Sequence, residues 1–456
     1  MNNPNNRALP VVLLVAMMAV ATPAAAKVSS ETAARLGNEL TPLGATRSGN
    51  ASGSIPPWQG GITEPPGDYR PGKHLPDPFA DDKPLFTITA ENYRDYEANL
   101  SPGQVALFQR YPASFRMPVY PSRRTASLPQ RIYDKTVANA TTATLTGDGN
   151  GVMHAAEGIP FPIPNNGLEA IWNHLLRYRG KTIVRSVGQA ALTAEGAYII
   201  VQLKEEVLWA YQQPGATTSN IDNILVYFIQ EVVSPPRLAG QFTLVHETLN
   251  QAVKPRKAWV YNPGQRRVRR APNVAYDNPG TASDGQRTND DYDMYNGSPD
   301  RYDWVLVGKQ ELYIPYNSYP LQSDQHRFDD ILGPGHINPD LTRYELHRVW
   351  VVDARLKQGT SHLYARRTFY LDEDSWHIAV VDQYDGRGEI WRVQQANLFN
   401  NYSVPLVGSA ASTIYDIQNG RYLVTELVNE YEPARFDVPL ERARFTPEVL
   451  RNLGRR

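Results

Sequence analysis

The chain has 456 residues, a formal net charge of −1 and no cysteine. Disulfide bonds are therefore excluded, and the balanced charge argues against general nucleic-acid binding, which needs a surplus of Lys and Arg. The 26 Tyr and 8 Trp favour β structure, because aromatic side chains suit pleated, half-buried surfaces. A chain of this length can bury enough surface to fold without disulfides.

Residues 1–26 have the pattern of a signal peptide. Arg7 precedes an apolar run over residues 11–21, and residues 24–26 are the small alanines that a signal peptidase needs. The run is shorter than the ~20 apolar residues of a membrane-spanning helix. We expect cleavage after Ala26 and a soluble periplasmic protein with no transmembrane span; a retained N-terminal anchor is the alternative.

Residues 27–165 are expected to form an extended Pro-rich arm with short helices that packs on the main body. Residues 42–164 hold 17 of the 36 prolines, and proline removes backbone donors, which excludes this stretch from the centre of a sheet. Aromatic residues scattered through it argue against simple disorder. Ser101 and Gln104 predict a helix start, since they form a capping box around a proline at the first helical position.

The clearest helix is expected over residues 166–180. Asn166 is a suitable N-cap, Glu169 completes a capping box, and Gly180 supplies the stop. This helix either packs on a sheet, as most amphipathic helices do, or lines a pocket. Its apolar face has the i, i+3, i+4, i+7, i+8 spacing and consists of Leu168, Ile171, Trp172, Leu175 and Leu176.

Residues 166–456 are expected to form one β-rich domain. Turn-forming residues at 372–375 and 385–388 separate consecutive runs of strand character. Successive hairpins make antiparallel neighbours, so we expect a meander that curls with the natural strand twist. The segments with a strand pattern are 223–233, 241–249, 344–353, 364–371, 376–384 and 389–395.

Two polar segments interrupt the β pattern. Residues 273–302 are rich in Asp, Asn and Gly and predict a long surface loop. Within it, residues 290–297 resemble a calcium loop, but Asn296 comes one residue late and the closing Glu is missing. A solvated loop is favoured, and a structural Ca²⁺ is the alternative. The basic run 266–270 predicts a hairpin with mostly exposed charges, which either pair with nearby Asp or meet an anionic partner.

No catalytic motif is recognisable in the sequence. It contains no nucleophile elbow, no H-E-x-x-H, no P-loop and no thiol. A zinc site would need His347, His362 and His377 to converge. Two pairs could supply acid–base groups for a hydrolase, but neighbours of this kind arise by chance. They are Glu345 with His347 and Asp372 with Asp374. We therefore expect no enzyme activity, no cofactor and no metal, with a hydrolase built from such dispersed residues as the alternative.

The chain has more tryptophans than a core between one sheet and one helix usually requires. A concave apolar binding site is a place where the additional tryptophans would serve a function. We therefore expect a hydrophobic ligand cavity. Its candidate residues are Leu168, Ile171, Trp172, Leu175, Leu176, Trp259, Trp350, Trp376 and Trp391.

Several strings resemble the exported bacterial family catalogued as domain of unknown function 1329. They occur at 53–58, 159–164, 166–180, 261–272, 343–352 and 371–392. That family is similar to the LolA-type lipoprotein carriers, which implies an incomplete β-barrel wrapped around helices with a hydrophobic cavity. It also implies work beside a transporter of the resistance-nodulation-division (RND) class and an outer-membrane partner. The resemblance transfers no catalytic or ligand-binding residue.

Together these observations predict a soluble periplasmic carrier or binding protein for a lipid or other hydrophobic molecule. The alternative is an accessory subunit of an envelope transport complex that binds no ligand and uses a sheet edge or the Pro-rich arm as its interface.

Overall fold

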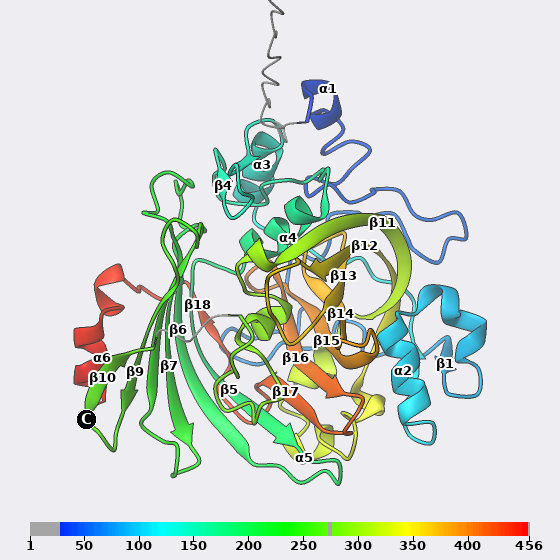
Figure 1. Ribbon diagram of the computed structural model, residues 1–456. Helices are drawn as coiled ribbons and strands as arrows, with labels where there is room; N and C mark the ends of the chain where they lie inside the picture. Colours follow the sequence, from blue (N-terminus) through cyan, green and yellow to red (C-terminus); the bar gives the residue numbers. More distant parts are fainter. Residues whose placement is uncertain (1–27, 272–275, 455–456) are drawn as a thin grey trace, which may run out of the picture.

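The computed structural model of the chain describes residues 28–271 and 276–454, so the predicted signal peptide and its cleavage site lie outside the described residues. Most strands form one long, curved sheet, with helices at its ends and on its faces (Figure 1). The structure confirms the predicted β-rich fold with a curved, open, antiparallel sheet. None of the helices in these two stretches is long and apolar enough to cross a bilayer.

The main sheet has 16 strands, in the order β1-β2-β12-β13-β14-β15-β16-β17-β5-β6-β7-β8-β9-β10, with β11 beside β12 and β18 beside β5. Its neighbours are antiparallel, except that β2 meets β12 in parallel. The strands are β1 (Phe86–Ile88), β2 (Met117–Val119), β5 (Thr182–Leu192), β6 (Ile200–Trp209), β7 (Ile224–Ser234), β8 (Phe242–Thr248), β9 (Lys257–Asn262), β10 (Arg267–Arg270), β11 (Tyr302–Pro315), β12 (Tyr344–Leu356), β13 (Arg366–Asp372), β14 (Ile378–Tyr384), β15 (Ile390–Asn401), β16 (Leu406–Asp416), β17 (Tyr422–Leu427) and β18 (Arg435–Phe436). A separate hairpin pairs β3 (Thr144–Leu145) with β4 (Val152–Met153).

The helices are short and lie between or beside the strands. The α-helices are α1 (Ser30–Ala33), α2 (Pro102–Arg110), α3 (Gln130–Asn139), α4 (Gly167–Leu176), α5 (Phe328–Ile331) and α6 (Pro447–Leu453). The 3₁₀ segments are η1 (Tyr93–Asn99), η2 (Asn289–Met294), η3 (Pro299–Arg301), η4 (Tyr319–Gln322), η5 (Pro339–Leu341) and η6 (Arg442–Arg444).

The predicted hairpins are confirmed. The strands β13, β14 and β15 are consecutive antiparallel neighbours, joined at the two predicted turns. The basic run lies in the hairpin of β9 and β10, where Arg267, Arg269 and Arg270 are exposed. These elements were predictable because each depends on residue types adjacent in the sequence.

The helix α4 differs from its prediction at its end. Asn166 caps it as expected, accepting a hydrogen bond from the Glu169 backbone N–H at 2.9 Å, but the Glu169 carboxylate reaches Asn165 N–H rather than that of Asn166. The helix stops at Leu176 instead of continuing to Gly180. Arg177 is extended there (ψ 153°), and its guanidinium donates to the His174 carbonyl at 2.8 Å. That side-chain bond satisfies a carbonyl at the helix end and replaces the predicted stop.

The N-terminal residues that precede α4 pack against the rest of the chain at several places. Strands β1 and β2 extend one end of the sheet, and α2 lies against β14 and β15 (Figure 1). The predicted capping box of α2 is present, with Ser101 and Gln104 bonded reciprocally. Gln104 also donates to the Tyr313 carbonyl at 2.8 Å. The division of the chain into an arm (27–165) and a β domain (166–456) stays a prediction.

Asp382, inside β14, joins α2 to the sheet. Its carboxylate accepts hydrogen bonds from the Ser101 hydroxyl at 2.9 Å and from the Tyr370 hydroxyl at 3.2 Å. A Cβ added to Gly103 would lie 2.1 Å from the Asp382 carboxylate oxygen, so this close approach requires glycine. Burial raises the pKa of Asp382 to about 6, although the hydrogen bonds from Ser101 and Gly103 oppose that rise.

This raised pKa predicts a loss of stability as the pH rises. The folded protein holds the Asp382 proton more tightly than the unfolded chain, so the contribution is present below pH 3.8 and is lost as the pH passes about 6. The loss corresponds to about 3 kcal/mol. Urea titrations between pH 4 and pH 8 should show a shallower slope in Asp382→Asn than in the wild type; part of the slope remains in both, because the pKa of Asp372 is also raised, to about 7. The exposed Asp81→Asn is the matched control, and an unchanged slope in Asp382→Asn would contradict the assignment.

Candidate ligand-binding site

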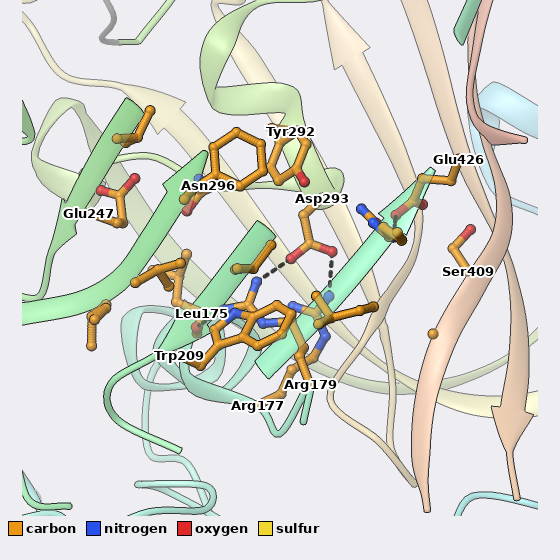
Figure 2. A pocket seen from close by; sticks show the side chains of 18 of the residues that line it. Leu175, Arg177, Arg179, Trp209, Glu247, Tyr292, Asp293, Asn296, Ser409 and Glu426 are labelled. Atoms are coloured by element: carbon orange, nitrogen blue, oxygen red, sulfur yellow. Dashed lines mark hydrogen bonds and ion pairs between the residues drawn. The ribbon is translucent and has the colours of Figure 1, made fainter. Parts of the chain in front are cut away.

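A cavity of about 240 Å³ lies against one face of strands β5 to β8 (Figure 2). Its other walls come from the segment 276–302 and from β15, β16 and β18. A smaller hollow of about 40 Å³ adjoins it and shares Arg185, Gln230, Arg287, Tyr292, Asp293 and Glu426. The residues that line the larger cavity all lie between Leu175 and Phe436.

The strand register explains the apolar wall. Side chains alternate between the two faces of a strand, and directly paired residues share a face. The pairs Ile183↔Val207, Val207↔Phe228 and Phe228↔Val245 therefore form one continuous apolar row across four strands. All four side chains line the cavity.

The neighbouring row, two residues along each strand, is polar. It runs from Arg185 through Glu205 and Gln230 to Thr243, by the same register. Arg185 binds Glu205 at 2.7 Å and Glu426, on β17, at 3.2 Å. The cavity wall is thus amphipathic, with an apolar band beside a polar band.

Asp293 anchors the polar side of the cavity. It pairs with Arg177 and, at 2.5 Å, with Arg179, so both arginines that follow α4 converge on it (Figure 2). Burial alone would raise the pKa of Asp293, but the two arginines outweigh burial and hold that pKa well below its ordinary value. The backbone is left-handed at Asp293 (φ 54°) and at Met294 (φ 68°), a conformation uncommon for residues other than glycine.

His377 also faces this group but carries no charge at neutral pH. Burial, followed by the charge of Arg177, lowers its pKa to about 3. The three histidines considered for zinc do not converge. His347 pairs with Glu345 and His362 with Asp290, each at 3.0 Å, whereas His377 lies 3.8 Å from Asp293.

The prediction that residues 290–297 form a solvated loop is wrong, and the surface loop predicted over 273–302, described over 276–302, is exposed only within residues 278–285. Asp290 and Asp291 are 1% and 2% exposed. Asp290 binds His362 and Arg367, whereas Asp291 accepts hydrogen bonds from Gln383, Gln394 and Tyr364. The calcium-like stretch therefore directs its carboxylates to protein donors. These donors lie far away in the sequence, so the sequence did not reveal them. The one local sign of burial was the group of large side chains Tyr292, Met294 and Tyr295, which are unusual in a solvated loop.

The structure distributes the nine predicted ligand residues over several places. Leu175 lines the cavity. Ile171, Trp172 and Leu176 belong to the main core, and Leu168 packs against it. Trp350 and Trp376 stack on each other with ring centroids 5.9 Å apart. Trp259 meets His246 edge-on, and Trp391 donates to Asp416. Whether any of these side chains contacts a ligand stays a prediction.

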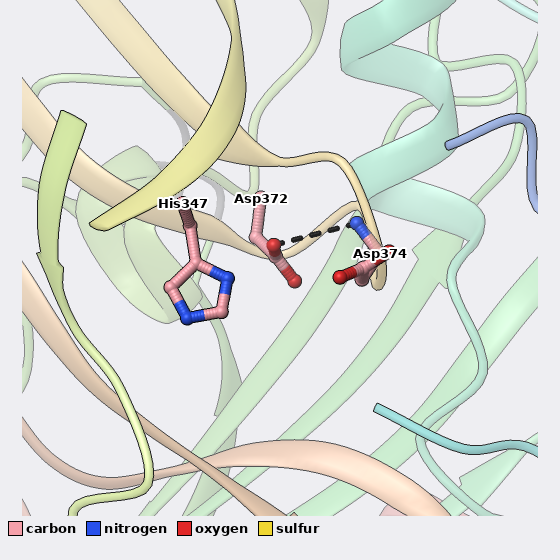
Figure 3. Close-up of side chains that lie close together, drawn as sticks. All are labelled: His347, Asp372 and Asp374. Atoms are coloured by element: carbon pink, nitrogen blue, oxygen red, sulfur yellow. Dashed lines mark hydrogen bonds between the residues drawn. The ribbon is translucent and has the colours of Figure 1, made fainter. Parts of the chain in front are cut away.

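A second polar cluster surrounds the turn between β13 and β14. His347, Asp372 and Asp374 place one potential metal-ligand atom each within 4.8 Å of one another (Figure 3). Both oxygens of Asp374 are taken by Arg124, at 2.6 and 2.8 Å, and His347 is bonded to Glu345. Asp372 accepts from the Ser375 hydroxyl at 2.6 Å. Because protein donors already satisfy these groups, we interpret the cluster as structural.

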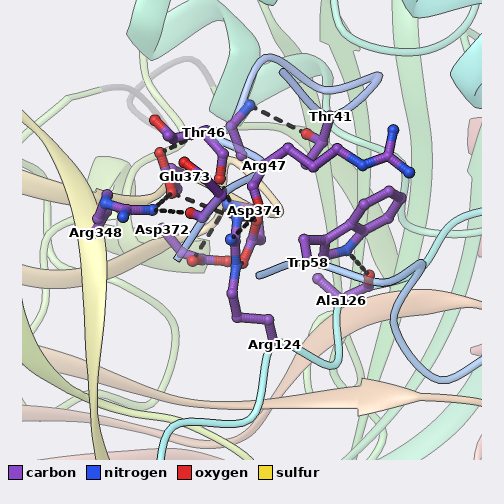
Figure 4. A network of polar contacts seen from close by, with 12 residues as sticks. Thr41, Thr46, Arg47, Trp58, Arg124, Ala126, Arg348, Asp372, Glu373 and Asp374 are labelled. Carbon is purple, nitrogen blue, oxygen red and sulfur yellow. Dashed lines mark hydrogen bonds and ion pairs between the residues drawn. The ribbon is translucent and has the colours of Figure 1, made fainter. Parts of the chain in front are cut away.

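The same cluster fastens the N-terminal segment to the sheet (Figure 4). Arg124 also donates to the carbonyls of Thr46 and Arg47, at 2.8 and 3.2 Å. Glu373 accepts from the Thr46 backbone N–H at 3.1 Å. Burial, with the charge of Asp374 next, raises the pKa of Asp372 to about 7. The network therefore connects Thr46 and Arg124 to a turn that lies 327 and 250 residues later, respectively.

Comparisons with known proteins give a family match over most of the chain. The family described as "Protein of unknown function (DUF1329)" matches residues 87–451. The uncharacterized protein PA3922 of Pseudomonas aeruginosa is 49% identical over 442 residues, which cover 97% of each chain.

Among solved structures, a putative outer membrane lipoprotein-sorting protein domain from Vibrio parahaemolyticus matches with 14% identity and a TM-score of 0.43. The match covers 62% of this chain and 98% of that one. A DUF1329 family protein from Desulfovibrio piger matches with 15% identity and a TM-score of 0.42, over 60% and 92% of the two chains.

Proposed function

The chain belongs to the DUF1329 family of proteins of unknown function, and we propose that it is a periplasmic carrier or binding protein for a lipid or other hydrophobic molecule. The observation that supports this proposal is the cavity of about 240 Å³ beside the apolar row Ile183, Val207, Phe228 and Val245. Burial of a ligand methylene against such a wall contributes about 0.8 kcal/mol. A short alkyl chain would therefore gain several kcal/mol from this wall alone.

The proposal predicts that a ligand accompanies the purified protein. The full chain, produced in a bacterial periplasm and purified without detergent, should carry a lipid or hydrophobic small molecule in near-stoichiometric amount. Native mass spectrometry followed by organic extraction measures the occupancy and identifies the class of ligand. A clean apo mass that stays unchanged after incubation with envelope lipids would contradict the proposal.

Filling the cavity should abolish binding. Val245, half-buried in β8, faces the cavity, so Val245→Trp places an indole where the ligand chain would lie. Displacing a few methylenes at ~0.8 kcal/mol each lowers the affinity for the ligand at least about tenfold, and the occupancy falls with it at limiting ligand concentration. Val253→Trp, at a position that is 77% exposed, is the control and should retain the ligand. Equal occupancy in both variants would place the binding site elsewhere.

We further propose that cargo passes between the carrier, an RND-class transporter and an outer-membrane partner. Release to such partners would need a state that binds the ligand less tightly. Cross-linking in intact envelopes tests this part of the proposal, and recovery of no stable partner would count against it. One observation favours the accessory-subunit alternative. The strand β10 lies at one end of the sheet and carries exposed arginines, so a partner could pair with this edge. A ligand-free protein that still recovers a transporter would support that alternative.

A further inference from the structure

Five arginines line the cavity, and four of them are paired with carboxylates. Arg177 and Arg179 share Asp293, Arg185 binds both Glu205 and Glu426, and Arg256 binds Glu247 at 2.6 Å. The fifth is Arg287, which lines both the cavity and the smaller hollow beside it. Four of the five arginines thus pair with four carboxylates, and Arg287 is the fifth.

Arg287 is buried and forms no ion pair with any residue that the structure describes. The residue is 8% exposed, and its Nε atom is buried without a hydrogen-bond partner. Within the described parts of the chain, no carboxylate oxygen lies within 4.0 Å of its guanidinium. The guanidinium Cζ instead lies 5.5 Å from the centre of the Tyr292 ring. A Cβ added to Gly280 would lie 2.8 Å from Cζ, so the guanidinium lies close to the backbone at this glycine.

The nearest acids are engaged elsewhere. Glu205 is bonded to Arg185 and Gln230, and Glu426 to Arg185 and the Ser412 hydroxyl. Asp291 accepts from Gln383 and Gln394. Burial lowers the pKa of Arg287, yet a guanidinium stays protonated in proteins. Arg287 therefore remains a buried cation without an ion pair among the described residues, and the more distant charges of Asp291, Glu205 and Glu426 offset only part of its desolvation.

We propose that the cavity binds a single-chain amphiphile whose one acidic head group, a carboxylate or a phosphate, pairs with Arg287 while its alkyl chain lies along the apolar row. This inference rests on the proposed carrier function and adds the class of ligand. A guanidinium offers a planar fork of donors that matches both head groups. The volume of about 240 Å³ lies below the ~300–1,000 Å³ of sites for drug-sized ligands, which favours one chain over several.

The test compares ligands that differ only in their head group. Dodecanoate, dodecyl phosphate, dodecanol and dodecylammonium are titrated below their micelle concentrations into the delipidated full-length protein. The wild type should bind an anionic ligand at least about tenfold more tightly than dodecanol, because a charge-assisted hydrogen bond in a buried site has that effect. The ratio between dodecanoate and dodecyl phosphate distinguishes the two head groups.

The variant Arg287→Met should lose the preference for anions but keep its affinity for dodecanol. Arg269→Met, at an exposed arginine of β10, is the control and should keep the preference. The ligand-free Arg287→Met protein should melt no lower than the wild type, since the substitution removes a buried charge that is only partly compensated. A marked fall in its melting temperature would show that Arg287 has a structural role and would overturn the inference.

The remaining outcomes separate the two proposals. If dodecanol and dodecanoate bind equally well to the wild type, the head-group inference fails and the carrier function stands. If none of the four ligands binds, the cavity is not a site for alkyl chains and the inference fails; the carrier function fails as well if the purified protein also has a clean apo mass that envelope lipids do not change.

Discussion

Replacement of Arg124 by Met is expected to lower the free energy of unfolding by about 3–5 kcal/mol. The Arg124 and Asp374 side chains are 2% and 1% exposed, and they form a bidentate pair with N···O distances of 2.6 and 2.8 Å. Removal of the guanidinium leaves Asp374 buried without its cation and beside Asp372. It also removes the hydrogen bond to the Thr46 carbonyl, whereas the Arg47 carbonyl keeps the one from the Trp58 backbone N–H.

Urea titration followed by tryptophan fluorescence measures this loss. Arg116→Met is the matched control, because the Arg116 and Asp340 side chains are 40% and 71% exposed, and exposed pairs contribute at most about 1 kcal/mol. The double variant Arg124→Met/Asp374→Asn should recover part of the lost stability, since it removes the orphaned charge. A single variant within about 1 kcal/mol of the wild type would show that the cluster does not fasten the N-terminal segment.

Replacement of Trp376 by Ala should also lower the free energy of unfolding by about 3–5 kcal/mol. Trp376 is fully buried, stacks on Trp350 at an interplanar angle of 12°, and donates from Nε1 to the Leu43 carbonyl at 2.8 Å. The substitution leaves a large cavity and an unsatisfied carbonyl. Its backbone is left-handed (φ 62°), and alanine retains the Cβ, so relief of backbone strain does not offset the loss.

Trp376→Phe is the matched variant. It keeps an aromatic ring for stacking and loses the hydrogen bond to Leu43, so its loss should stay near 1–2 kcal/mol, roughly the effect of an unsatisfied buried acceptor. Equal losses in both variants would contradict the packing argument. Ligand occupancy of each variant, measured well below its melting temperature, also shows whether Trp376 contacts the ligand, as its place among the nine candidates suggests.

The local elements of this protein follow from adjacent residues, and the sequence therefore predicted them. Ser101 and Gln104 cap α2, Asn166 caps α4, and the turns at 372–375 and 385–388 join strands where expected. Each of these features depends on residues within four positions of one another, as capping and turn formation require. The hairpins of the sheet were predictable for the same reason, whereas the pairings of β17 with β5 and of β2 with β12 join segments that lie far apart in the sequence.

The cavity was only partly predictable. The alternation over 241–249 identified one face of β8, whereas β7 lies in a continuous apolar run that identifies no face. The row that joins Ile183 to Val245 exists only in the register of four strands. Of the nine candidate side chains, Leu175 lines the cavity, and the tryptophans lie elsewhere in the structure. An amphipathic face shows that a side chain is buried but does not show what covers it.

The sequence by itself determined the β-rich class, the caps, the hairpins and the family resemblance. Only the tertiary structure decided the position of the polar segment 276–302, because its composition is that of a solvated loop. Arg177, Arg367 and Gln383 satisfy its carboxylates from 70 or more residues away, whereas Arg287 forms no ion pair with residues 28–271 or 276–454. Burial of a charged group depends on the partners that the fold brings to it, and the residues beside it in the sequence do not reveal those partners.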